Sequence, residues 1–164
     1  MLNHHHSLTG EGLDAGLLGG SAVALWFLLK DSLAGRPLLT PSLLGQLLIL
    51  PGHAPTIWPA DFGAVVTYTV VHFLAFVVFG LLASWLVRLA DLHSMARFAL
   101  VILFVVFEVA FYVLIQTIAD SVGKYFPLFW VLTGNLLATA VMGRYFWRKH
   151  PALRRGLIRE PLGT

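Results

Sequence analysis

Long apolar stretches separated by short polar breaks dominate the chain, a pattern typical of membrane-spanning helices. The longest covers residues 98–119, FALVILFVVFEVAFYVLIQTIA, with one formal charge, Glu108, near its middle. As a helix it is roughly 33 Å long, enough to cross the hydrocarbon core of a bilayer. Similar stretches, with the residues that begin and end them, predict four spanning helices over residues 11–33, 61–90, 94–119 and 125–147.

A fifth, shorter helix is predicted between the first two spans, over residues 41–50. Thr40 is expected to cap it and Pro51-Gly52 to end it, as Thr9 is expected to cap the first span. Because it is too short to cross a bilayer and nearly apolar all round, we expect it in the membrane interface. The predicted fold is all-α, a single domain forming an integral membrane four-helix bundle with one short periplasmic interfacial helix.

Composition supports the membrane class and narrows the chemistry. Of 164 residues, 58% are hydrophobic and 12% are charged, against about 25% charged in a soluble domain.

The absence of cysteine excludes thiol catalysis, iron–sulfur ligation and disulfides. No nucleophile-elbow, zincin, P-loop or dinucleotide motif is present, so no enzyme activity is expected. The net charge of +3 gives no case for nucleic-acid binding. No metal site is predicted, since residues 4–6, three histidines, fit a solvated end or a tag remnant better than a ligand set.

The distribution of Lys and Arg predicts the topology. With four spans, the second inter-helix turn and the C-terminal tail share one side, which holds eight basic residues against three on the other. The excess places both termini in the cytoplasm of a bacterial inner membrane. The basic tail, residues 148–164, follows Tyr145, Phe146 and Trp147 and is expected to contact anionic lipid or a partner subunit.

A ridge of small residues marks one face of the first span. Gly12, Gly16, Gly20 and Ala24 recur at four-residue spacing and include a G-x-x-x-G pattern. Such ridges let two helix backbones approach closely in lipid. The pattern leaves open whether the partner helix belongs to this chain or to another.

Three polar residues on three different spans are expected at similar depth. By the helical rise, His72, Glu108 and Asn135 each lie roughly 13–16 Å below the outer ends of their helices. We therefore predict a buried cluster facing the bundle interior. Its structural interpretation is helix association with a protonated Glu108; its functional interpretation is a proton or ion relay through Glu108 and His72.

Cofactor binding has less support in the residues. His72 is the one histidine deep in a span, whereas bis-histidine haem needs two facing ligands. No cofactor is predicted for the chain alone. A haem, pigment or quinone contact shared with a partner stays open.

The run from Ala22 to Asp31, AVALWFLLKD, followed by GRPLLTPSLLG over residues 35–45, resembles uncharacterised small multi-pass membrane proteins of bacteria. The resemblance covers roughly a fifth of the chain and implies a membrane setting without an activity. Within this region, Asp31 and Arg36 are close enough in sequence to pair and to fix how the first span leaves the membrane. The alternative is two solvated interface charges.

The sequence therefore favours a non-catalytic accessory or scaffolding subunit that packs through the small-residue ridge into a larger bacterial membrane complex. Respiratory and photosynthetic assemblies are examples of such a complex. The alternative is a small proton-coupled transporter or channel that uses Glu108 and His72.

Overall fold

The computed structural model describes residues 7–92, 96–118 and 127–151, which form five helices and no strand. The helices are α1 (Leu8–Leu33), α2 (Leu39–Ile49), α3 (Phe62–Leu92), α4 (Ala96–Ile118) and α5 (Leu128–Lys149). Each corresponds to one of the five predicted helices, with ends that differ by up to three residues. The all-helical class is therefore confirmed.

Two helices are long and apolar enough to cross a membrane by length and composition, Leu8–Leu33 and Phe62–Ala90. Within the described residues, Leu39–Ile49 and Ala99–Val113 are shorter apolar segments. The structure thus supports two of the four predicted spans directly.

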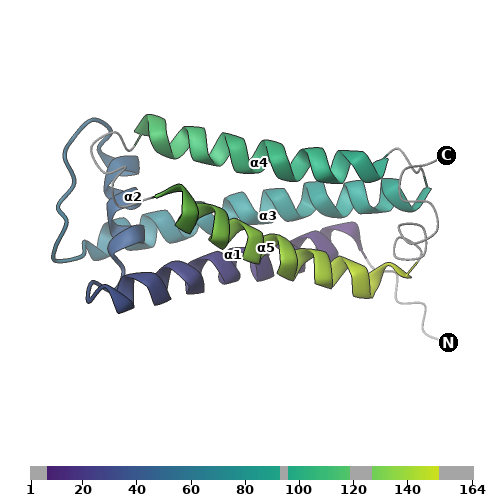
Figure 1. Cartoon of the computed structure of the whole chain (residues 1–164), viewed down its shortest axis with the longest axis horizontal. Coiled ribbons are helices and arrows are strands. Elements are labelled where there is room, and N and C mark those ends of the chain that lie inside the picture. The colour runs from purple at the N-terminus through teal and green to yellow at the C-terminus, as the bar shows by residue number, and fades with distance from the viewer. Residues whose placement is uncertain (1–6, 93–95, 119–126, 152–164) are drawn as a thin grey trace.

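The four long helices run along the long axis of the molecule, and short α2 lies at one end, beside the connection from α1 to α3 (Figure 1). α1 packs mainly on α3 and also on α5, whereas α2 packs on the beginning of α3. α4 rests chiefly on α3 and has little contact with α5. The bundle therefore has a closely packed side, made of α1, α2 and α3, and a looser side where α4 meets α3 and α5.

The predicted ridge on α1 makes this close packing possible, and its partner is α3 of the same chain. A methyl group added at Gly16 would lie 2.5 Å from the Phe76 carbonyl oxygen, and one at Gly80 would overlap Gly12 and Gly16. These helices meet backbone to backbone, at a distance that only glycine permits. Ala24 is exposed, so the contact ends at Gly20.

α5 packs on α1 through larger side chains as well as glycine. The Trp26 indole Nε1 donates to the Trp130 carbonyl at 3.1 Å, and the two rings lie 5.5 Å apart. Gly19 faces the Met142 thioether. This contact anchors α5 to the closely packed side.

Both predicted helix caps are wrong. The cap of α1 is Ser7, whose hydroxyl accepts from the Gly10 amide at 3.1 Å. α2 begins after Leu38, which adopts a left-handed conformation with φ 66° and gives no side-chain cap. Thr40 lies inside the first turn of α2. The Asp31 carboxylate, from α1, accepts from the Thr40 amide and takes the place of the missing cap.

Candidate functional site

The structure brings together two of the three residues predicted to cluster, Glu108 and Asn135. Asn135 is buried on α5, and its Nδ2 donates a hydrogen bond to Glu108 Oε2 on α4. This bond crosses the looser side of the bundle, where α4 and α5 otherwise have little contact. Depth matching along the helices therefore found a pair that joins two helices.

Glu108 uses only one of its two carboxyl oxygens in this pair. Oε1 is shielded from solvent and has no hydrogen-bond partner among the described residues. A carboxylate oxygen that lacks both water and a donor is costly when charged. The Glu108–Asn135 pair is therefore incompletely hydrogen-bonded within the described residues.

His72 lies elsewhere in the bundle, against α1. Its Nε2 is 3.0 Å from the Gly20 carbonyl oxygen, which can only accept, so this nitrogen carries the proton. Tyr68, Phe73 and Phe76 surround the ring, with centroids 4.8–5.5 Å away. No hydrogen bond joins His72 to Glu108, both of which lie in the described part of the chain. Instead of a triad, the structure has a Glu108–Asn135 pair and a separate His72–Gly20 contact.

Asp31 is fully buried and serves as the missing cap of α2, in place of the predicted pair with Arg36. Its carboxylate accepts from the Thr40 amide at 2.6 Å and the Thr40 hydroxyl at 3.0 Å, and Lys30 Nζ lies 3.3 Å away. Arg36 is exposed, and its backbone amide bonds the Asp31 carbonyl. The predicted side-chain pair is therefore replaced, because the helix N-terminus offers Asp31 aligned donors.

The opposite end of the bundle contains a polar cluster that sequence reasoning missed. Buried Glu11 lies 3.3 Å from His150 Nε2 and 3.9 Å from Arg88 Nη2. Beside it, the Tyr145 hydroxyl donates to Asp14 at 3.0 Å. These contacts place the start of α1 and the ends of α3 and α5 together. Counting residues along the predicted spans would have put Glu11 and Arg88 at one level, although not in contact.

Two mainly apolar cavities lie between the described helices. One, of about 170 Å³, lies between α1, α2 and α3 and is lined by Phe27, Thr40, Tyr68 and His72 among others. The other, of about 220 Å³, lies between α3, α4 and α5. Neither connects Glu108 to His72 through polar side chains.

Within residues 7–92, 96–118 and 127–151, no three His, Cys, Asp or Glu side chains are grouped to hold a metal ion. His72 donates its Nε2 proton to a carbonyl and lies in an aromatic shell. The histidines at residues 4–6 and most of the basic tail, 152–164, fall outside the described residues.

Comparisons with protein-family models, curated proteins and solved structures found no match for this chain.

Proposed function

We propose that the protein is an integral membrane four-helix bundle of the bacterial inner membrane, with α2 on the periplasmic side and both termini in the cytoplasm. Large apolar side chains on the outside of the long helices support this setting. Examples are Leu25 at 66% exposed, Leu74 at 60%, Val101 at 62% and Leu136 at 57%. Contiguous apolar surface on this scale is unusual for a soluble monomer, whereas lipid covers it without cost.

Within that membrane, we propose a non-catalytic role as an accessory or scaffolding subunit of a larger complex. This proposal rests on one observation, the hydrogen bonds that the deep polar side chains form within the chain. His72, Asn135 and Asp31 each bond another segment of the same chain, and the neighbouring cavities are mainly apolar. Within the described residues, these side chains join segments of the chain and line no continuous polar path, as expected of a structural component.

The partner contact proposed from the sequence needs a different location. The small-residue ridge is covered by α3, so a companion protein has to bind another face. The looser α4 side is the better candidate, because α4 packs least on the other described helices and its outer face is apolar. A companion packed there would depend on the position of α4, which the hydrogen bond from Asn135 to Glu108 helps to fix.

Native-size analysis of membranes solubilised in mild detergent tests this role. Mass spectrometry should find the protein in a large species together with fixed companions. Glu108→Gln should weaken this association, whereas Asp14→Asn, which changes an exposed acid at the cytoplasmic end, should leave it intact. A protein that runs alone or as a small homo-oligomer would refute the accessory role.

A second function, proton-coupled transport, is favoured by Glu108 Oε1, which has no partner in the part of the chain that the structure describes. A carboxyl group buried between two helices is a suitable proton acceptor if an opening of the α4–α5 contact exposes it. In proteoliposomes with a pH-sensitive dye, an imposed potential should then drive proton flux. That flux should disappear in Glu108→Gln and persist in Asp14→Asn. Equal flux in the Glu108→Gln variant and the parent would exclude this mechanism.

A further inference from the structure

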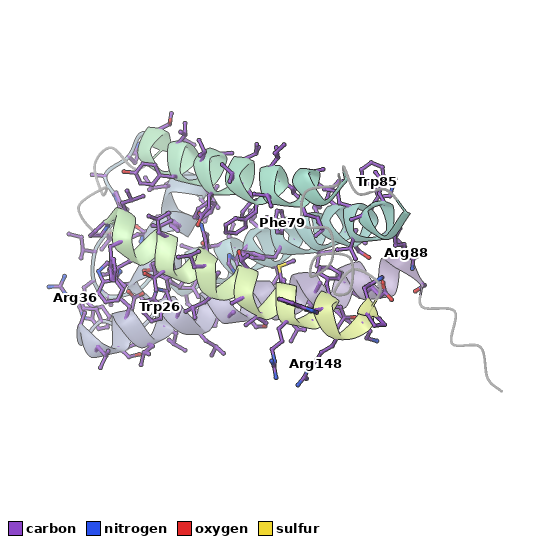
Figure 2. The ribbon with its side chains drawn as sticks, turned by 45° about the vertical axis from the view of Figure 1, so that its right-hand side comes forward. Trp26, Arg36, Phe79, Trp85, Arg88 and Arg148 are labelled. Carbon is purple, nitrogen blue, oxygen red and sulfur yellow. The ribbon has the colours of Figure 1, made fainter. Side chains whose placement is uncertain are left out.

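An apolar slot separates α4 from α5 on the looser side of the bundle. α3 forms its floor through Phe79, Ala83 and Val87, and its volume is about 220 Å³. Phe79 lies between α3 and α4 (Figure 2), with its ring centroid 4.3 Å from that of Phe107. The Thr139 hydroxyl in its wall already donates to the Asn135 carbonyl at 2.9 Å. The slot therefore suits a hydrocarbon better than a polar group.

The slot continues into a wider, open hollow over the last turns of α5. Thr139, Gly143 and Trp147 line both spaces. The hollow adds Arg144 and Arg148, which lie one helical turn apart on one face of α5. An apolar channel thus ends beside two positive charges.

Both arginines are exposed and form no ion pair with a described residue. Figure 2 shows Arg148 directed away from the bundle. Arg88 at the same end lies instead beside buried Glu11. Trp147, half exposed between the two arginines, has the position of an interfacial aromatic anchor.

We propose that this surface binds a phospholipid with an anionic headgroup, with one acyl chain in the slot and the phosphate against Arg144 and Arg148. Thr139, at the slot, and Arg148 are nine residues apart, roughly 13 Å along the helix axis, which suits a chain descending from the headgroup level. A cavity of about 150 Å³ holds benzene, so the slot has room for part of one acyl chain. Cytoplasmic leaflets supply anionic headgroups on the side proposed for this end.

An acyl chain fits the slot better than a peptide segment does. A peptide would bring backbone N–H and C=O groups that need hydrogen-bond partners, and the slot walls offer few. The inference rests on the membrane setting proposed above and is independent of the subunit role.

Native mass spectrometry of the purified protein, titrated with phosphatidylglycerol or phosphatidylcholine of equal chain length, tests the site. The parent should retain one phosphatidylglycerol in preference to phosphatidylcholine. Arg144→Gln together with Arg148→Gln should lower that preference roughly 30-fold, from the usual contribution of two basic residues near an anionic surface. Arg36→Gln, at the opposite end, should not change it.

Gly143→Leu tests the slot itself. A methyl group at Gly143 meets no described atom within 4 Å, and Gly143 lines the slot, so a larger side chain there occupies space that the acyl chain would need. It should reduce retention of both lipids, whereas Ala75→Leu, on the exposed face of α3, should not. Circular dichroism and thermal unfolding check that each variant is folded.

Equal retention of the two lipids by the parent, or unchanged preference in the double arginine variant, would overturn the site. Failure of the membrane setting gives a different result. The protein would then leave the membrane fraction in an alkaline carbonate wash, before any lipid is added.

Discussion

The α1–α3 contact and the α4–α5 contact each hold two helices together, but through opposite kinds of interaction. Between α1 and α3, glycines remove the side chains and the backbones touch. Between α4 and α5, a single described hydrogen bond, Asn135 to Glu108, spans helices that leave a slot beside it. Close backbone packing gives many small attractive contacts, whereas one polar bond gives modest stability and can be broken alone. The first contact suits a scaffold and the second a surface that admits a ligand or partner.

Gly80→Ala should have the largest effect on this comparison. The added methyl group overlaps the Gly12 carbonyl and Gly16, so the helices have to separate. We expect a loss of about 3 kcal/mol in the free energy of unfolding, although alanine is the better helix former. Unfolding of the purified protein in mixed micelles with increasing SDS measures it.

Gly143→Ala is the matched control, because it makes the same chemical change where no described atom lies within 4 Å. It should leave stability unchanged or raise it by about 0.5–1 kcal/mol through lower backbone entropy. Equal effects of the two substitutions would show that the two contacts do not differ in closeness.

Asp31→Ala should have the second largest effect, still within the closely packed side. It removes the acceptor from both the Thr40 amide and the Thr40 hydroxyl, which are buried. We expect a loss of about 1–3 kcal/mol, the usual cost of leaving such groups unpaired. Hydrogen exchange at the Thr40 amide should increase in parallel. Arg36→Ala should cost almost nothing; a loss as large as that of Asp31→Ala would restore the pair predicted from the sequence.

The smallest effect concerns the looser side and needs a double-mutant cycle. Glu108→Met and Asn135→Leu, alone and combined, should give a coupling free energy of about 0.6 kcal/mol, as for other bonds between membrane helices. Glu108→Met combined with His72→Leu should be additive within about 0.5 kcal/mol, since no bond joins those residues. Stronger coupling to His72 than to Asn135 would support the predicted triad instead.

The helices and one of the polar contacts could be predicted from the sequence. Apolar stretches and their breaks placed all five helices, because period and length depend on local sequence alone. Depth along those helices was enough to pair Glu108 with Asn135. The spacing of Gly12, Gly16 and Gly20 also identified a packing face without identifying its partner.

The remaining contacts depend on how the helices are rotated against each other, which the sequence does not state. His72 reaches the Gly20 carbonyl because glycine leaves that backbone uncovered once α1 and α3 are in contact. The sequence predicts a pair between Asp31 and Arg36, but Leu38 turns the chain so that the Thr40 amide faces Asp31 instead. Glu11 draws its partners from α3 and from the residue that follows α5, far away in the sequence.

The connection between α2 and α3 belongs to the closely packed side of the bundle and is fixed by hydrogen bonds from α2. The Gln46 side chain bonds both the amide and the carbonyl of Thr56, and the Ser42 hydroxyl accepts from the Asp61 amide at 2.9 Å. Gly45 then lies against the Ala64 carbonyl. The partners of all these groups, like those of Gly80 and Asp31, come before residue 93. During synthesis, all residues that form these contacts therefore leave the ribosome before α4 does. The contacts between α1, α2 and α3 can form first, and α4 and α5 then pack against them.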